Sequence, residues 1–177
     1  MKKVGVLSLQ GDFAAHGAAV ERAGALPVYV RERSQLGEID GLILPGGESS
    51  TMLKLLHYEN LFDDVVDYGR RKPMFGTCAG AILMARDVTN PAQESLGLMD
   101  IEVERNAYGR QVDSRVVELE AVFIRAPIIR RAGQGIHVLA EYAGDPVLIE
   151  QGQYLVATFH PELTRDARVH SLFLEKL

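Results

Sequence analysis

The chain has 177 residues, of which 47% are hydrophobic, so it can bury a core of its own and is not a disordered chain. Its 19 lysines and arginines against 24 aspartates and glutamates give a formal net charge of −5. A mildly acidic chain without a basic cluster is a poor candidate for nonspecific nucleic-acid binding, so we expect no nucleic-acid partner. A single cysteine excludes an internal disulfide and fits a reducing compartment.

Apolar runs in the sequence are short. The first, residues 4–9, is shorter than the apolar core of a signal peptide. No run approaches the roughly 20 residues that cross a membrane. We therefore expect a cytoplasmic protein that has no membrane partner.

Strand-like and helix-like segments alternate through the first half of the chain, as in proteins whose parallel sheet is covered by helices. Short apolar runs that end at turns predict strands over residues 4–9, 27–30, 41–47 and 73–77. Helical spacing predicts helices over residues 13–23, 49–57, 59–71 and 79–86.

The second half differs, because its segments are short and rich in β-forming residues. Strands are predicted over residues 99–105, 114–119, 121–125, 136–141, 147–150 and 154–159, and a closing helix over 166–176. We therefore predict one α/β domain over residues 1–177. Its central sheet is mostly parallel and flanked by helices, with additional antiparallel strands in the second half.

A cysteine follows one predicted strand and lies between two glycines. The run Gly76-Thr77-Cys78-Ala79-Gly80 has the form G-x-C-x-G between a strand and a helix, which is the thiol version of a nucleophile elbow. Small neighbours permit the strained backbone of such a turn, and the start of the next helix favours the thiolate. A lone cysteine is more often a small buried hydrophobe, but this setting favours Cys78 as a nucleophile.

A histidine and a glutamate follow the last predicted strand. If residues 158–162 stay extended, His160 and Glu162 project to the same face. The carboxylate can then hold one imidazole nitrogen while the other exchanges protons with a nucleophile. An isolated H-x-E pair would more often be a structural histidine beside a surface glutamate. Among the other histidines, His57 and His170 are predicted to be surface residues of helices.

The loop Pro45-Gly46-Gly47-Glu48-Ser49 follows a third predicted strand. Acyl transfer needs backbone N–H groups aimed at the developing oxyanion, and glycines let a loop approach the substrate closely. The N–H groups of Gly47 and Ala79 are our candidate oxyanion donors, while Ser49 has an alternative role as the N-cap of the next helix. Since ligands bind beyond the carboxyl ends of parallel strands, we expect these three loops to form one site.

Together the three loops resemble those of the class I, triad-type glutamine amidotransferases. The chain resembles more closely the family of glutaminase subunits of pyridoxal 5′-phosphate synthase, in blocks that run in the family's order through residues 9–163. These blocks are LQG (9–11), LPGGES (44–49), FGTCAG (75–80), ERNAYGRQ (104–111), FIRAP (123–127) and FHPEL (159–163). The fourth and fifth blocks are not general amidotransferase features, so they make the closer resemblance specific.

This resemblance implies that the chain hydrolyses L-glutamine to L-glutamate and ammonia through a thioester, with no metal or organic cofactor. The ammonia would pass to a synthase subunit that makes pyridoxal 5′-phosphate. Cys78, His160 and Glu162 would form the catalytic triad, and Gln10 would sense the synthase partner. The residues implied to bind glutamine are Gly47, Glu48, Ser49, Arg105, Ile124 and Arg125; an arginine suits the α-carboxylate.

The sequence departs from the family pattern at three places. Ser50 stands where threonine is frequent, Ala15 stands where glutamate is common, and the stretch between Asp113 and Val122 is shorter than expected. Three alternative functions stay open: a glutaminase for another pathway such as imidazole glycerol phosphate synthesis, a non-catalytic glutaminase-like binding subunit, and a cysteine hydrolase with an unrelated substrate. The two specific blocks weigh against the first alternative, and the intact triad residues weigh against the second.

Overall fold

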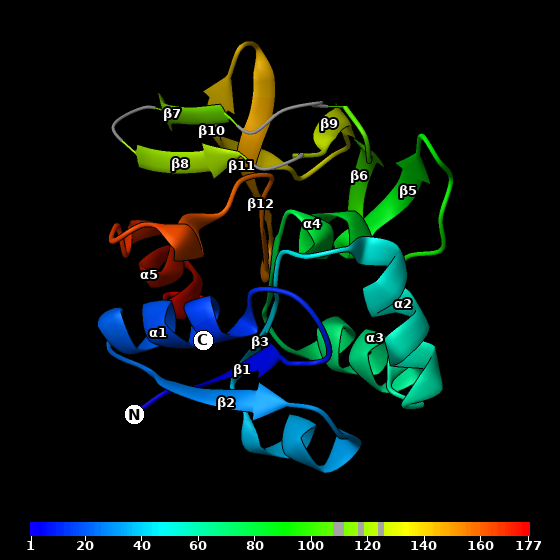
Figure 1. Cartoon of the computed structure of the whole chain (residues 1–177), viewed down its shortest axis with the longest axis vertical. Helices are drawn as coiled ribbons and strands as arrows, with labels where there is room; N and C mark the ends of the chain where they lie inside the picture. The colour runs from blue at the N-terminus through cyan, green and yellow to red at the C-terminus, as the bar shows by residue number, and fades with distance from the viewer. Residues whose placement is uncertain (108–111, 117–118, 124–125) are drawn as a thin grey trace.

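The computed structural model describes residues 1–107 and 126–177, together with the backbone of residues 112–116 and 119–123. It is an α/β domain whose central sheet has helices on both faces (Figure 1), which confirms the predicted fold class. None of the helices in these residues is long and apolar enough to cross a membrane.

A seven-stranded sheet forms the centre, in the spatial order β10-β11-β12-β4-β3-β1-β2. The strands from β12 to β2 run parallel, whereas β11 is antiparallel to both β10 and β12. In chain order these strands are β1 (Lys3–Leu7), β2 (Leu26–Val30), β3 (Gly41–Leu44), β4 (Met74–Thr77), β10 (His137–Tyr142), β11 (Asp145–Gln151) and β12 (Tyr154–Ala157).

Two smaller sheets hold the remaining strands, and both contain antiparallel pairs as predicted for the second half. They are formed by β5 (Ala85–Thr89), β6 (Met99–Glu104) and β9 (Ile128–Ala132), and by β7 (Val112–Val116) with β8 (Leu119–Phe123). The sequence reading missed β5 and β9. It extended a helix to residue 86, whereas the chain leaves that helix at Met84 and enters β5.

Helices cover the two faces of the central sheet (Figure 1). On one face lie α1 (Phe13–Arg22) and α5 (Arg168–Leu174), and on the other lie α2 (Ser49–Tyr58), α3 (Phe62–Arg71) and α4 (Ala79–Met84). Two 3₁₀ turns, η1 (Arg33–Glu38) and η2 (Pro161–Leu163), were not predicted. In sequence they resemble ordinary loops, because a single turn has too few residues to show periodicity.

Each face of the sheet has its own apolar core, which follows from the alternation of side chains along a strand. In β3, Leu42 and Leu44 belong to the cluster under α2, α3 and α4, whereas Ile43 belongs to the cluster under α1 and α5. All three side chains are fully buried, and each such burial contributes about 1.5–3 kcal/mol relative to exposure. The strands therefore form a rigid platform for the loops at their ends.

Candidate active site

The site lies where four parallel strands end. Because β4 pairs with both β3 and β12, the loops that follow these strands are neighbours, and β1 lies next to β3. Two backbone hydrogen bonds join the loops: Cys78 N–H donates to Ala157 O at 2.9 Å, and Asp12 N–H donates to Gly46 O at 2.9 Å. The three predicted loops meet at one edge, together with the loop after β1.

Cys78 occupies a strained turn between β4 and α4. Its backbone has φ 48° and ψ −102°, a region that costs a non-glycine residue about 1–3 kcal/mol. The glycines around it are required by space: a Cβ on Gly80 would lie 2.1 Å from Leu44 O, and one on Gly76 would lie 2.6 Å from the Gly80 carbonyl. This geometry is that of a nucleophile elbow.

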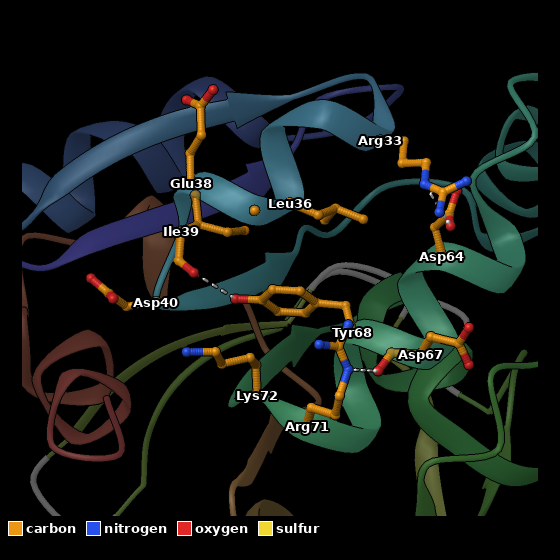
Figure 2. A pocket seen from close by; sticks show the side chains of 11 residues that line it. Arg33, Leu36, Glu38, Ile39, Asp40, Asp64, Asp67, Tyr68, Arg71 and Lys72 are labelled. Carbon is orange, nitrogen blue, oxygen red and sulfur yellow. Dashed lines mark hydrogen bonds and ion pairs between the residues drawn. The ribbon is translucent and has the colours of Figure 1, made fainter.

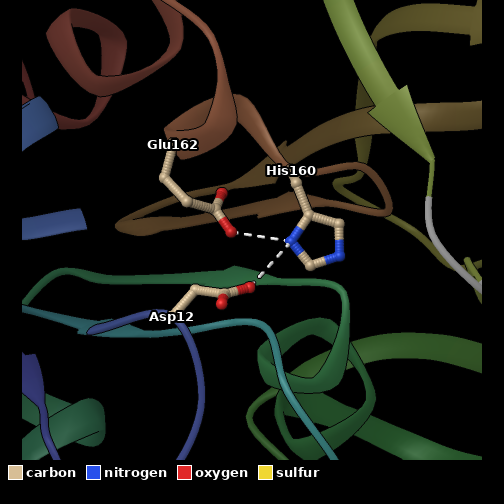
Figure 3. Close-up of side chains that lie close together, drawn as sticks. All are labelled: Asp12, His160 and Glu162. Carbon is tan, nitrogen blue, oxygen red and sulfur yellow. Dashed lines mark hydrogen bonds and ion pairs between the residues drawn. The ribbon is translucent and has the colours of Figure 1, made fainter. Parts of the chain in front are cut away.

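His160 and Glu162 contact each other, as predicted. His160 Nδ1 and Glu162 Oε1 are 2.7 Å apart, and both side chains are almost fully buried (Figure 3). The reason given for the contact was wrong, because Pro161–Leu163 form the turn η2 and are not extended. The turn brings the glutamate side chain back toward the ring, so the pair forms by a different local geometry.

The imidazole of His160 packs on the glycine loop after β3. A Cβ on Gly46 would lie 2.3 Å from His160 Cε1, so only glycine fits beneath the ring. Burial alone would lower the pKa of His160, but hydrogen bonds with Cys78 and Glu162 and the charges of both groups raise it to about 10. The Cys78 and Glu162 side chains therefore favour a protonated imidazole.

A second carboxylate, which the sequence reading missed, also faces this ring. Asp12 Oδ2 lies 3.5 Å from His160 Nδ1, so the two carboxylates approach the same ring nitrogen (Figure 3). Asp12 is in the loop after β1, at the N-cap of α1. Its side chain is 44% exposed, and screening by water therefore weakens its pull on the imidazole.

Asp12, His160 and Glu162 are also the one group of candidate metal ligands found in the described parts of the chain. Their donor atoms fit a hydrogen-bonded cluster better than a metal site. Two ligands about 2.1 Å from a tetrahedral ion stand about 3.4 Å apart, whereas His160 Nδ1 and Glu162 Oε1 are 2.7 Å apart. That separation is a hydrogen bond, which uses the nitrogen that a metal would need.

A pocket of about 480 Å³ opens beside Cys78. It brings together the predicted site residues Gln10, Gly47, Glu48, Ser49, Cys78, Arg105 and His160, and adds Asp12, Ile82 and Asn106. The predicted oxyanion donor Ala79 follows Cys78 directly and is buried. Two predicted glutamine-binding residues, Ile124 and Arg125, lie outside the described residues. The side chains of the segment between Asp113 and Val122 are also outside the described part of the chain.

The N-cap of α2 is Glu48, which corrects the alternative role given to Ser49. The Glu48 carboxylate accepts hydrogen bonds from the N–H groups of Ser50 and Thr51, and Ser49 is the first residue of the helix. Burial would raise the pKa of Glu48, but the hydrogen bonds from Ser50 and Thr51 lower it to about 2. The ionised carboxylate lies 3.4 Å from Arg105 Nη2 and so orients that arginine at the pocket wall.

Gln10 fixes the loop that carries Gly47. Its Oε1 accepts a hydrogen bond from Glu48 N–H at 3.0 Å. A Cβ on Gly47 would lie 2.5 Å from this same oxygen and 2.9 Å from Gly11 Cα. Gln10 and Gly11 thus pack closely against the loop, and a side chain at position 47 has no room.

Gly47→Ala is therefore expected to lower the catalytic rate by at least about tenfold, because the added methyl group displaces Gln10 and the loop near Cys78. Catalytic turnover should be compared for Gly47→Ala and Gly37→Ala. Gly37 is a matched control, because a Cβ there meets nothing within 4 Å. Equal rates for the two variants would show that the loop at Gly47 does not set the geometry of the site.

Two further histidines lie behind Glu162, and one of them corrects a prediction. His170 was predicted to be a surface residue but is 1% exposed, and His16 is fully buried; His57 is exposed as predicted. Burial, His170 and His160 lower the pKa of His16, whereas burial and Arg22 lower that of His170 to about 4. Both rings sit on the apolar faces of short helices, where sequence spacing alone does not separate a buried histidine from an exposed one.

These two pKa shifts predict a loss of stability in acid. A neutral native histidine contributes stability that is fully present above its unfolded pKa of about 6.5 and is lost as the pH falls toward the native value. The cost is about 1.4 kcal/mol per pH unit for each group. Between pH 7 and pH 5, His170→Gln should lose about 2 kcal/mol less unfolding free energy than the wild type, measured by urea titration. An identical loss in the two proteins would contradict a neutral buried His170.

A second pocket of about 480 Å³ lies among η1, α3 and the starts of β3 and β4. Because parallel strands begin at the edge opposite to the one where they end, this pocket is remote from Cys78. Several polar groups of its lining are bonded within the chain: Arg33 pairs with Asp64 at 3.3 Å, and Tyr68 donates to Ile39 O (Figure 2). It holds no nucleophile beside a base, so the pocket at Cys78 is the better candidate.

Comparison with known proteins identifies a glutamine amidotransferase family. The model of the SNO glutamine amidotransferase family matches residues 6–177. The pyridoxal 5'-phosphate synthase subunit PdxT of Solibacter usitatus (strain Ellin6076) is 74% identical over 192 residues, covering 100% of both chains. The protein of the same name from Koribacter versatilis (strain Ellin345) is 54% identical over 182 residues, covering 98% of this chain and 94% of that one.

Solved structures agree with this similarity. A crystal structure of a glutamine amidotransferase has a TM-score of 0.89 and 44% identity, and the match covers 98% of this chain and 97% of the other. The structure of PurLQS from Thermotoga maritima has a TM-score of 0.70 at 17% identity, which shows a shared fold alone. The alignment with the Solibacter relative is 192 residues long against 177 residues here, so it contains gaps in this chain.

Proposed function

The chain belongs to the SNO glutamine amidotransferase family, and from this premise we propose that it is the glutaminase subunit of a pyridoxal 5′-phosphate synthase. It hydrolyses L-glutamine to L-glutamate and ammonia, which a synthase subunit consumes. The observation that carries the proposal is the elbow cysteine beside a buried His160–Glu162 pair, in a chain 74% identical to a relative named as this subunit.

The reaction begins at Cys78. Its thiolate attacks the side-chain amide carbon of glutamine, and the carbonyl electrons move onto oxygen. The N–H groups of Gly47 and Ala79 stabilise this oxyanion. When the tetrahedral intermediate collapses, the C–N bond breaks and His160 protonates the departing nitrogen, which leaves as ammonia. A glutamyl thioester remains on the cysteine.

Hydrolysis of the thioester completes the cycle. His160, now neutral, accepts a proton from water, and the resulting hydroxide attacks the thioester carbon. Collapse releases glutamate and restores the thiolate beside the imidazolium. Glu162 keeps Nδ1 of His160 protonated and stabilises the positive ring in both halves of the cycle. The raised pKa of His160 supports this role, since the ring must carry the proton that ammonia takes.

Substrate binding is assigned to the walls of the pocket. Arg105, whose guanidinium is oriented by Glu48, receives the α-carboxylate of glutamine. The backbone of Gly47 and Glu48 and the hydroxyl of Ser49 lie along the side chain of the substrate. Ile124 and Arg125 complete the site on the strength of the family resemblance. We also propose a cytoplasmic location, because the single cysteine is the nucleophile and a reducing compartment keeps its thiol free.

Partner control follows from the glycine loop. The Gly46 carbonyl accepts a hydrogen bond from Asp12 N–H, so the Gly47 N–H of the same peptide points away from Asp12. Reorienting this peptide costs one backbone hydrogen bond, about 1 kcal/mol. Gln10, which holds the next N–H, is the residue through which the synthase acts on the loop. Docking of the synthase thus completes the oxyanion hole only when an acceptor for ammonia is present.

We therefore expect the isolated chain to be nearly inactive, and excess synthase to raise kcat far more than it changes KM, as for stabilisation made mainly in the transition state. Steady-state release of glutamate should be measured with and without the cognate synthase. Equal kcat values in the two conditions would contradict partner-completed catalysis. A second synthase, from imidazole glycerol phosphate synthesis, should give no activation, which separates this function from its nearest alternative.

A further inference from the structure

The carboxylate of Glu162 has a second neighbour besides His160. Its Oε1 is used by His160, while Oε2 is buried and makes no hydrogen bond with the described residues. This free oxygen faces His16 Nε2 at 3.4 Å, and both side chains are fully shielded from water. A buried carboxylate oxygen that accepts no hydrogen bond costs stability. The position of the His16 ring nitrogen next to this oxygen therefore calls for a physical explanation.

His16 is itself held on both ring nitrogens. Its Nε2 lies 2.9 Å from Thr77 Oγ1, and its Nδ1 lies 3.0 Å from His170 Nε2. Thr77 is the residue before Cys78, so His16 touches the elbow and the triad glutamate at once. The rings come from α1 and α5, on the face of the sheet opposite to α4.

The protons of these rings can be placed by elimination. With its hydrogen on Nε2, His16 donates to Thr77 Oγ1 and presents the positive end of this N–H bond near Glu162 Oε2, 3.4 Å away, whereas a lone pair there would face negative charge. Nδ1 of His16 is then an acceptor, and His170 donates to it from Nε2. This leaves His170 Nδ1 as a bare acceptor, in agreement with its lack of a hydrogen-bond partner in the described structure; an orphaned acceptor is more tolerable than an orphaned N–H.

We propose that His16 is a positioning residue for the triad: its Nε2–H donates to Thr77 Oγ1 and attracts Glu162 Oε2 from 3.4 Å, which orients the glutamate, and His170 fixes the tautomer that makes this possible. The inference rests on the proposed function of Cys78, His160 and Glu162. It extends the triad by two buried groups that touch neither substrate nor nucleophile.

A purely structural role is the alternative, because His16 also fills space beside Phe75, with ring centroids 6.2 Å apart. The two roles differ in what they do to the glutamate. Loss of a donor raises the pKa of a buried carboxylate, whereas loss of packing does not act on ionisation directly. The titratable groups that face this cluster are His160 and Asp12 on the Glu162 side, and His170 and Arg22 behind His16.

The test compares His16→Gln with His16→Leu in the complex with the synthase. The glutamine side chain introduced at position 16 keeps an N–H near the position of Nε2, whereas the leucine side chain has no N–H. We expect His16→Leu to lower kcat about tenfold to a hundredfold, the effect of removing the polar group nearest to a buried charged oxygen. KM should stay within about twofold, and the acid limb of the kcat/KM profile should move to higher pH. His16→Gln should recover most of the rate, and the exposed control His137→Gln should match the wild type.

A double-mutant cycle gives a second readout. In a Glu162→Gln background, adding His16→Leu should change kcat by less than about twofold, because the group that His16 positions is already altered. If His16→Leu does not fold, His16→Asn replaces it, since asparagine is polar but too short to reach Oε2. Equal kcat values for His16→Gln and for the variant that lacks the N–H donor, His16→Leu or His16→Asn, would overturn the proposal. Additive effects of His16→Leu and Glu162→Gln in the cycle would also overturn it. Either result would leave the proposed function standing, which instead fails if Cys78→Ala stays active.

Discussion

Replacing Cys78 by alanine should abolish glutamine hydrolysis, with a loss of at least about 10⁴-fold in kcat of the complex with the synthase. The thiolate forms the covalent bond on which both halves of the reaction depend, and no second cysteine can replace it. Alanine keeps the Cβ that the turn already accommodates, so the fold and the strained backbone should be retained. Glutamate release at saturating glutamine is the measurement.

The control for Cys78→Ala is binding to the synthase. The variant should form the complex with the wild-type affinity and should show the same circular dichroism spectrum. Loss of activity together with loss of binding would point to a damaged fold, and Cys78→Ser then replaces it as the test, because serine keeps the shape of the side chain. Turnover of either folded variant near the wild-type rate would show that another group attacks the substrate.

The second large effect is expected at the histidine of the triad. His160→Asn should lower kcat by about 10⁴-fold, because the imidazole gives a proton to the leaving nitrogen and takes one back from water. Glu162→Gln should cost less, since the amide oxygen can still orient the ring but no longer carries charge. Single-turnover and steady-state rates of the complex give both numbers.

Asp12 is a matched comparison within the same cluster. It lies on the same imidazole nitrogen as Glu162 but is partly exposed to water. If charge at this nitrogen is what matters, Asp12→Asn should have a smaller effect than Glu162→Gln, because water screens the exposed carboxylate. Near-normal rates for His160→Asn would require a different base, and a larger effect of Asp12→Asn would assign the supporting role to that residue.

The fold and the placement of Cys78, His160 and Glu162 at one site could be predicted from the sequence because both depend on local patterns. Close packing requires apolar residues in the buried strand β4 and glycines beside Cys78, so both features are visible in the sequence. The contact between His160 and Glu162 was expected, although the turn that makes it was not. An i, i+2 pair can meet in more than one backbone geometry, so the spacing predicted the contact and not the conformation.

The supporting residues were harder to find because they depend on distant parts of the chain. His16 and His170 are 154 residues apart and meet only when α1 and α5 pack on the same face of the sheet. Glu48 replaced Ser49 as the N-cap because its longer side chain reaches back to two N–H groups, although short side chains are usual there. Asp12 was missed for a simpler reason: a lone aspartate after a strand has no spacing pattern that marks it.

The most direct test of the account is labelling with an electrophilic analogue of glutamine in the presence of the synthase, read by intact mass and peptide mapping. It joins the two central points, the identity of the substrate and that of the nucleophile. We predict one adduct per chain, on the peptide that contains Cys78, with loss of glutaminase activity in step with labelling and protection by L-glutamine. An adduct at another residue, or complete inactivation without labelling of Cys78, would contradict it.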